Sequence, residues 1–297
     1  MSDTRISRFY KKNHKKVLIV PIILLILSAL TILYLDNSRN YIINKDVSLK
    51  GGISATIISS QSINSQEIED HLKSKFPESD ISVRTIANIA STFESGIIVE
   101  ATDIKNEDLK PALEEKIQID DYSVQELGSS LGESFFQEMI RAIAFALLFM
   151  AVVVFITFRK LIPSVAVILS AILDLTATLA VIGLLNIKLS SAGIAAFLMV
   201  IGYSIDTDIL LVTRVLKRKL GTTYEKIQNA FKTGMTMSLT TIAALTVAAI
   251  ITNSTILRQM FMIIIIALII DIISTWMMNA GLLAWYEERK NKKNEAQ

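Results

Sequence analysis

Long apolar runs along the chain are separated by polar connections, one of which is much longer than the others. Six of the runs are nearly free of charged residues and are long enough to cross a bilayer. Unpaired backbone N–H and C=O groups are costly in lipid, so each run is predicted to form a helix. The strict alternation typical of barrel strands is absent. The six predicted spans are residues 17–34, 142–158, 161–185, 192–213, 235–252 and 260–285.

The long polar connection, from Asp36 to Glu138, contains its own pattern of secondary structure. Alternating β-branched residues predict strands, and helical runs lie between them. We expect Asn64 or Ser65 to cap the first helix and Asn106 to cap the second, with Pro111 as an irregularity. The order βαββαβ predicts a ferredoxin-like domain. Its expected elements are strand 53–59, helix 65–76, strand 81–90, strand 96–101, helix 106–118 and strand 122–127.

Composition supports a membrane-spanning α-helical fold, with 52% hydrophobic residues and a mean hydropathy of +0.48. The first run is predicted to be an anchor, because it exceeds a typical signal-peptide core and no small-x-small cleavage pattern follows it. The expected parts are a basic tail (1–16), transmembrane helix 1 (17–35), the ferredoxin-like domain (36–138), transmembrane helices 2 to 6 (139–286) and a second tail (287–297).

Lysine and arginine predict the orientation in the membrane. They gather before the first span, after the second, between the fourth and fifth, and at the end of the chain, whereas the alternate short connections hold only Lys188 and Arg258. The positive-inside rule therefore places both termini in the cytoplasm and residues 36–138 outside the cell membrane. The net charge of +2 follows from this topology, and we predict no nucleic-acid partner.

Aspartates inside the spans are the strongest functional signal. Asp174 lies in the third span, Asp206 and Asp208 in the fourth, and Asp271 in the sixth. A carboxylate at the centre of a bilayer costs about 2.5 to 3.5 kcal/mol on insertion scales, which favours function over packing for Asp206 or Asp208. Asp174 is equally compatible with a structural role and with a place in an ion pathway.

Helical geometry separates the two neighbouring aspartates. At 100° per residue they point about 200° apart, so they cannot both face one site. Asp206 shares its face with Gly202 and Tyr203, whereas Asp208 shares its face with Ser204. Which of the two titrates stays open.

Hydroxyl and amide side chains form stripes on the last two spans. Regular helical spacing places Asp271, Thr275, Met278 and Asn279 along one side of the sixth span, and Thr240 lies among further threonines on the fifth. These stripes fit a proton wire. They also fit simple packing, because interhelical hydrogen bonds average roughly 0.6 kcal/mol and hold helices together without conduction.

Other chemistry is not supported. There is no cysteine, and neither His14 nor His71 has a partner at metal-ligand spacing, so no metal and no cofactor are predicted. A Ser-His or Cys-His pair within the spans, a P-loop and the Gly-x-Gly-Asp signature of intramembrane aspartyl peptidases are all missing. We therefore expect no enzyme.

The layout and three motifs resemble a known family. One span, a ferredoxin-like domain and five further spans are similar to half of an RND-superfamily transporter. The motifs narrow the resemblance to the SecF family, the smaller membrane subunits of SecD/SecF pairs. They are Gly202-Tyr203-Ser204-Ile205 followed by acids and Arg214, the turn Lys50-Gly51-Gly52, and the block from Asp271 to Asn279.

Two places in the sequence differ from the bacterial members of that family. The bacterial members typically read Asn-Asp-Thr where this chain has Asp206-Thr207-Asp208, a form that resembles the archaeal branch. They also carry an arginine before the fifth span's Ser-Leu-Thr-Thr, where this chain has Thr233.

The resemblance implies assistance to Sec-dependent protein translocation, coupled to an ion-motive force of H⁺ or Na⁺. It implies a heterodimer with a SecD-like subunit, and contact with the Sec translocon channel, the unfolded polypeptide in transit and membrane lipid. The ion pathway would draw on Asp174, Asp206, Asp208, Asp271, Asn279 and Thr240. The alternative is an RND-type exporter of small molecules or lipids that acts as a homodimer, although residues 36–138 barely exceed one ferredoxin-like unit.

Overall fold

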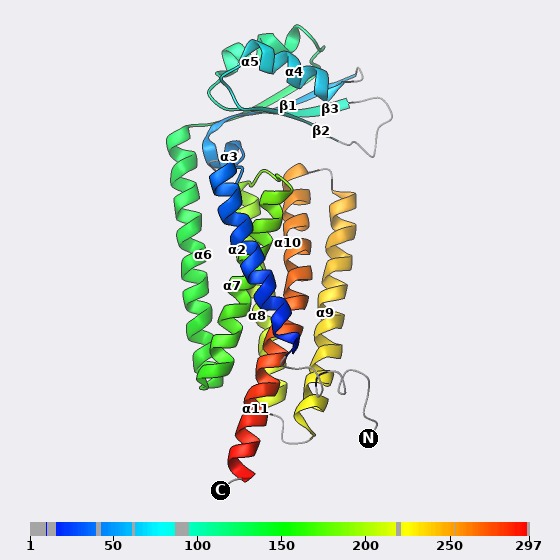
Figure 1. Ribbon diagram of the computed structural model, residues 1–297. Helices are drawn as coiled ribbons and strands as arrows, with labels where there is room; N and C mark the ends of the chain where they lie inside the picture. Colours follow the sequence, from blue (N-terminus) through cyan, green and yellow to red (C-terminus); the bar gives the residue numbers. More distant parts are fainter. Residues whose placement is uncertain are drawn as a thin grey trace.

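The computed structural model describes residues 10, 16–39, 43–60, 63–86, 95–217, 221–252 and 254–295. Six helices in this part of the chain are long and apolar enough to cross a membrane, as the sequence predicts. They form an elongated bundle with the ferredoxin-like domain at one end (Figure 1). The helices are α2 (Ile19–Arg39), α6 (Ser129–Phe158), α7 (Leu161–Leu184), α8 (Ser191–Lys217), α9 (Thr223–Ile251) and a sixth made of α10 (Thr255–Ile273), η1 (Ser274–Asn279) and α11 (Ala280–Glu295).

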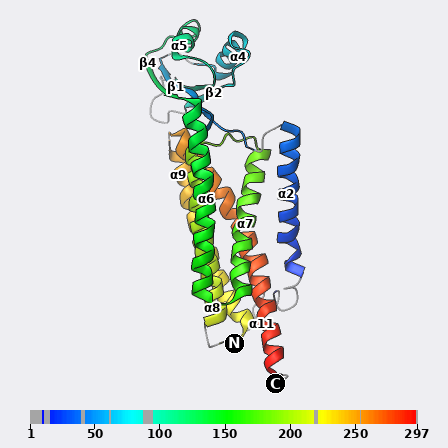
Figure 2. The same ribbon diagram turned by 90° about the vertical axis from the view of Figure 1, so that its left-hand side faces the viewer.

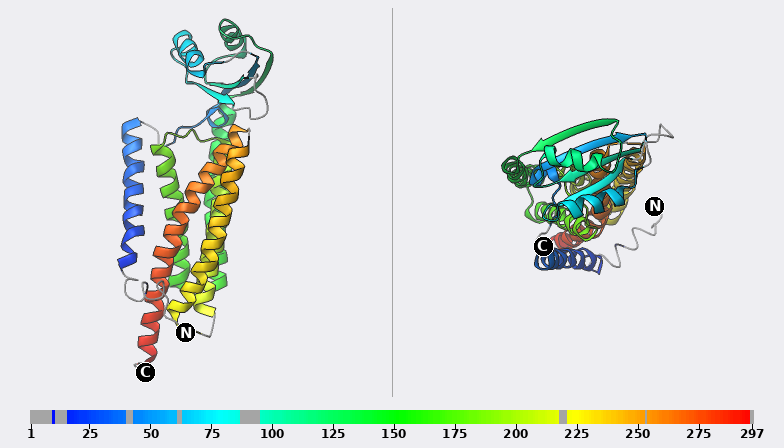
Figure 3. Two further views of the ribbon diagram at one scale, coloured as in Figure 1. Left: turned by 90° about the vertical axis from the view of Figure 1, so that its right-hand side faces the viewer. Right: turned by 90° about the horizontal axis from the view of Figure 1, so that it is seen from above.

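The helices differ in how far the protein itself buries them. The most apolar stretches of α7 and α8 are 56% and 50% buried, whereas those of α6 and α9 are each 11% buried. Helix α2 packs along α7 at one side of the bundle (Figure 2), and α9 lies beside α10 (Figure 3). Helices α7 and α8 therefore form the centre, and much of α6 and α9 is left for lipid or a partner.

The sixth membrane helix is not regular. Residues Ser274–Asn279 form a π-helical segment, η1, between α10 and α11. The sequence predicts an uninterrupted α-helix here, because apolar residues and good helix formers continue on both sides. A π turn inside an α-helix changes which residues share a face, and such turns are frequent at functional sites.

The ferredoxin-like domain has the predicted order of elements. Four antiparallel strands, in the order β2-β3-β1-β4, form one sheet covered on one face by α4 and α5 (Figure 1). Alternate residues of β1 point into the core beneath the helices, among them Ile53, Ala55 and Ile57. The elements are β1 (Gly52–Ser59), α4 (Ser65–Lys75), β2 (Ile81–Ile86), β3 (Ser95–Ala101), α5 (Asn106–Glu114) and β4 (Asp121–Leu127). Residues 87–90, predicted as the end of the second strand, lie outside the described residues.

The two helix caps have different outcomes. Asn64 caps α4 as predicted, because its side chain accepts hydrogen bonds from the backbone N–H groups of Gln66 and Glu67. The prediction for Asn106 is wrong. Lys105 occupies the N-cap position of α5 without a side-chain bond, and Asn106 Oδ1 instead accepts a hydrogen bond of 2.6 Å from the Tyr122 hydroxyl. Asn106 therefore joins the helix to β4.

Backbone hydrogen bonds join the domain to the bundle. Asp46 N donates to Leu189 O at 3.0 Å, and Leu189 N donates to Asn44 O at 2.6 Å. Leu189 lies in the connection between α7 and α8, while residues 44–46 lead through the short helix α3 (Val47–Lys50) into β1. These hydrogen bonds tie the centre of the bundle to the segment that leads into the sheet.

Candidate functional site

Three of the four predicted aspartates meet in the middle of the bundle. Asp174 comes from α7, Asp208 from α8 and Asp271 from the end of α10, and each is at most 1% exposed. Their helices lie against one another. We call these three residues the carboxylate cluster.

Hydroxyl groups join the members of the carboxylate cluster. Asp174 accepts hydrogen bonds from Ser204 at 2.7 Å and from Ser274 at 2.5 Å. Asp271 has the hydroxyls of Thr207 and Thr275 within 3.2 Å. All four hydroxyl residues are buried. A continuous polar path therefore crosses from α7 through α8 to η1.

The hydroxyl of Thr275 lies between two carboxylates of the cluster, Asp208 and Asp271. Thr275 Oγ1 lies 2.9 Å from Asp208 Oδ1 and 3.2 Å from Asp271 Oδ1. Asn279 donates a further hydrogen bond of 2.5 Å to Asp208 Oδ1, while Asp208 Oδ2 has no hydrogen-bond partner among the described residues.

These contacts leave the cluster short of hydrogen-bond donors. A threonine hydroxyl has one proton to donate, so Thr275 cannot donate to Asp208 and Asp271 together when both are ionised. Thr207 faces the same conflict, because its hydroxyl also lies 2.9 Å from Ser204 O. A proton on Asp271 resolves one of the two conflicts, since the carboxyl group then donates to one of the two hydroxyls.

The charge balance leads to the same conclusion. No salt bridge to a lysine, arginine or histidine is found for Asp174, Asp208 or Asp271 within the part of the chain that the structure describes. Buried like charges without a counter-ion are strongly unfavourable, so the cluster needs protons or a bound cation. Groups of three or more acidic, histidine or cysteine residues arranged to hold a metal ion are absent among the described residues. The arrangement suits the uptake and release of a small ion.

The π-helical segment determines which residues of the sixth helix reach the cluster. Ser274, Thr275 and Asn279 all contact its carboxylates. Met278 packs with Leu173 and Ala177 of α7 in an apolar cluster, so it contributes no polar group to the carboxylate cluster.

Several buried polar residues near the carboxylate cluster were not predicted as site residues from the sequence. Ser274 and Thr207 form part of the hydrogen-bonded path. Ser170 and Thr178 are both fully buried on α7, four residues before and after Asp174. Their spacing places all three on one helix face, so this stripe was readable from the sequence. Thr207 stands where bacterial relatives typically have the acid, and here it bonds the carboxylate of Asp271 instead.

The remaining predicted pathway residues lie away from the cluster. Asp206 is exposed on the other side of α8, together with Gly202 and Tyr203, whose side chain is 37% exposed. Thr240 is exposed on α9 and donates to carbonyl groups of its own helix. A Cβ atom placed on Gly202 would meet nothing within 4 Å. The structure therefore separates Asp206 from Asp208, as the helical geometry predicts, and buries only Asp208.

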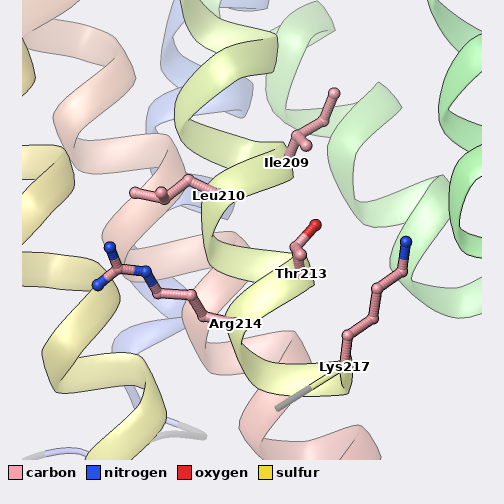
Figure 4. Close-up of a pocket in the computed structure, with 5 residues that line it drawn as sticks. All are labelled: Ile209, Leu210, Thr213, Arg214 and Lys217. Atoms are coloured by element: carbon pink, nitrogen blue, oxygen red, sulfur yellow. The ribbon is translucent and has the colours of Figure 1, made fainter.

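Arg214 marks the end of this exposed side of α8. It lines a hollow of about 380 Å³ together with Ile209, Leu210, Thr213 and Lys217 (Figure 4). The Arg214 side chain points toward α9, where Nη1 donates a 2.5 Å hydrogen bond to Asn229 O, while Lys217 points to the other side (Figure 4). Arg214 thus links α8 and α9 near the end of the bundle remote from the ferredoxin-like domain.

The turn Lys50-Gly51-Gly52 has a structural explanation. Gly51 and Gly52 have φ angles of 84° and 129°, a region that favours glycine. A Cβ atom on Gly52 would lie 2.4 Å from Ala101 O, so a side chain is excluded there. Lys50 Nζ pairs with Asp80 at 2.8 Å. The turn directs the chain from α3 into the central strand of the sheet.

Known proteins share both the sequence and the fold. Residues 108–289 match the family described as "Protein export membrane protein SecD/SecF, C-terminal". "Protein-export membrane protein SecF" of Methanocaldococcus jannaschii is 38% identical over 93% of this chain and 96% of its own length. The protein of the same description from Methanothermobacter thermautotrophicus is 36% identical over 93% of this chain and 94% of its own length.

The fold has a solved counterpart in a larger protein. The crystal structure of SecDF, a translocon-associated membrane protein from Thermus thermophilus, matches with a TM-score of 0.75 at 18% identity. The match covers 94% of this chain and 38% of that one, so this chain spans well under half of SecDF. Together with the match over residues 108–289, the similarity to the archaeal proteins shows that this chain is a member of the SecD/SecF family of protein-export membrane proteins.

Proposed function

We propose that this chain is the SecF subunit of a SecD/SecF complex, and that its carboxylate cluster takes up and releases the ion that drives assistance to protein export. The observation that carries the proposal is the meeting of three buried carboxylates from three helices with no salt-bridged cation among the described residues. The SecF relatives do not favour the small-molecule or lipid exporter.

Ion uptake would change the packing of the central helices. Each proton or cation that enters neutralises charge in a low-dielectric environment, where the free energy of a buried charge is several kcal/mol. Two packings of α7, α8 and η1 can therefore exchange populations as the cluster is loaded and emptied. Whether the ion is H⁺ or Na⁺ is decided by measuring uptake of each by the purified complex.

Backbone hydrogen bonds at Leu189 connect the central helices to the ferredoxin-like domain, so a change in helix packing can reach the domain. The connection between α7, which carries Asp174, and α8, which carries Asp208, is hydrogen-bonded through Leu189 to residues 44–46. A shift of the helix pair would move the segment that enters β1. We expect the domain to move with the cluster's ion load and to act on unfolded polypeptide near the Sec translocon channel.

The exposed side of α8 is the proposed contact for a SecD-like subunit. Asp206 lies there in the middle of an apolar helix, beside Gly202 and Tyr203. An acid facing lipid is costly, and a glycine with open space above it permits close approach of another helix. Thr240 is exposed on neighbouring α9, and its hydroxyl oxygen can accept a hydrogen bond from a partner while its proton is donated within its own helix.

Export measurements in cells test the function. Depletion of this chain is expected to slow export of a Sec-dependent precursor. In cells that contain the chain, collapse of the ion gradient is expected to remove its contribution to export. Native purification is expected to yield a SecD-like membrane protein with it. Unchanged export in the depleted cells would overturn the proposed function, and purification of this chain alone would overturn the heterodimer.

A labelling experiment tests the orientation. The chain has no cysteine, so single cysteines report without background. Asp70→Cys in α4 and Lys292→Cys in α11 both place the thiol at an exposed position. A membrane-impermeant thiol reagent added to intact cells is expected to modify position 70 strongly and position 292 only after lysis. The reverse pattern would mean that the ferredoxin-like domain faces the cytoplasm.

A further inference from the structure

The uncovered face of the sheet looks toward the bundle and not into open solvent (Figure 1). Strand pairing places a polar row across this face, in which Ser82, Glu100, Ser54 and Gln125 stand opposite one another on successive strands. Opposite the row are the ends of α6 and α10 that lie nearest the domain. The two surfaces leave space between them.

The space consists of two adjoining hollows. One has a volume of about 530 Å³ and the other about 420 Å³, and Arg84 and Gln259 line both. Every strand contributes to their lining, from Gln125 on β4 to Ser82 on β2. We call these two hollows together the interdomain gap. Its course across the whole sheet suits an elongated ligand better than a compact one.

Acidic side chains gather at the larger hollow of the interdomain gap. Asp46, Glu100 and Glu126 line the larger hollow and Lys188 and Arg258 the smaller one, while Arg84 lines both. Apolar side chains of α6, Phe135 and Met139, form part of the wall of the larger hollow. A polypeptide in extended form offers backbone hydrogen-bonding groups to the polar row and apolar side chains to the α6 wall.

Glu100 and Arg84 are lining residues that each have a buried polar atom, Oε2 and Nε, with no hydrogen-bond partner among the described residues. Glu100 is 7% exposed, and its Oε1 pairs with Arg84. Burial raises the pKa of Glu100, and the nearby Asp46 carboxylate adds to the rise against the opposing effect of Arg84. Burial also raises the pKa of Asp46. Positive charge on a ligand would stabilise both carboxylates in their ionised form.

We propose that the interdomain gap binds an extended segment of the exported polypeptide, with a lysine or arginine of that segment beside Glu100. The proposal rests on the proposed function, because it requires a polypeptide in transit. Gln259 supports it as a fixed polar group, since it accepts from Ser190 at 2.6 Å and donates to the carbonyl group of Lys188. Side-chain contacts from a rigid sheet provide recognition with little dependence on the exact sequence.

Disulfide trapping in the complete complex tests the gap. Ser54→Cys and Gln125→Cys line it, and Asp70→Cys on the exposed side of α4 is the matched control. A precursor arrested during export, with a single cysteine in an extended segment, is expected to form adducts at positions 54 and 125 several-fold more than at position 70. Equal adducts at all three positions, or adducts at none, would overturn the proposal.

Charge and size give two further readouts. A lysine next to the precursor cysteine is expected to give several-fold more adduct than a glutamate, and Glu100→Gln is expected to remove that preference. Ser54→Trp is expected to lower export by filling the gap, whereas Ser123→Trp, exposed on the same sheet face but outside the lining, is expected to leave it unchanged. Normal complex yield for both variants separates blockage from misfolding.

The outcomes distinguish the two proposals. If depletion of the chain slows export but positions 54 and 125 trap only the SecD-like subunit, the gap is an assembly surface and the binding proposal fails alone. If depletion leaves export unchanged, the proposed function fails.

Discussion

Replacement of Asp208 by asparagine is expected to reduce export to the level of cells that lack this chain. The amide keeps the size of the carboxyl group and an oxygen for the hydrogen bonds from Thr275 and Asn279. It cannot gain or lose a proton near neutral pH and carries no charge to attract a cation. Ion uptake at the carboxylate cluster should therefore stop while the fold persists. The measurement is the export rate of a Sec-dependent precursor, normalised to the amount of assembled complex.

Asp206→Asn is the matched control for that variant. It makes the same chemical change two residues away on the same helix, on the exposed side instead of the buried one. An asparagine can still form hydrogen bonds with a partner helix, so we expect most of the export rate to remain. Wild-type export from Asp208→Asn would remove Asp208 from the mechanism. A loss as severe in Asp206→Asn would move the ion site to the face proposed for the partner.

The architecture was predictable because it depends on hydrophobic and polar patterns that extend over many consecutive residues. Six apolar runs and one alternating polar segment determine six spans and a βαββαβ domain, and both are found. The side-chain periods of helix and strand differ enough that neither is mistaken for the other over such lengths. Single positions were less certain. Asparagine is a residue type that favours the N-cap position of a helix. The side chain of Asn106 instead accepts a hydrogen bond from Tyr122, a residue of a strand that lies later in the sequence.

The grouping of the acids was only partly predictable. Helical geometry correctly separates Asp206 from Asp208, but it cannot say which side faces the neighbouring helices. That depends on how α8 rotates against α7 and α10, and thus on tertiary packing. On the sixth span, Thr275 and Asn279 reach the carboxylates as the stripe predicts, whereas the contact of Ser274 with Asp174 was not predicted. Ser170 and Thr178 could have been predicted to share the helix face of Asp174, because a spacing of four residues places side chains on one face without any tertiary information.

The close packing of α9 on the π segment suggests how the irregular helix is held. Trp276 lies within η1, is 3% exposed, and packs edge-to-face with Phe231 of α9 at a ring distance of 5.0 Å. Gly234 lies one turn after Phe231, and a Cβ atom there would come within 2.4 Å of the Trp276 ring. Only glycine leaves room for the indole. Thr275, next to Trp276, carries the hydrogen bonds to two carboxylates, so the position of the indole is linked to the geometry of the cluster.

Gly234→Val is therefore expected to destabilise the chain and to lower export together. Extra methyl groups in a packed interior typically cost about 1–3 kcal/mol, and a rigid indole cannot yield as a flexible side chain does. We expect a lower melting temperature of the purified chain in detergent, followed by circular dichroism, and a reduced export rate as Thr275 shifts.

Gly202→Val introduces the same β-branched residue into a membrane helix at a position with open space around it. The melting temperature of the purified chain should stay unchanged, while the yield of the complex with the SecD-like subunit should fall, because Gly202 lies on the face proposed for close helix contact. The two variants thus fail in different assays. An unchanged melting temperature for Gly234→Val would mean that the indole can move aside and that α9 does not hold the π segment. An unchanged complex yield for Gly202→Val would place the partner on another helix, and Asp206 would then need a different explanation for its position in the membrane.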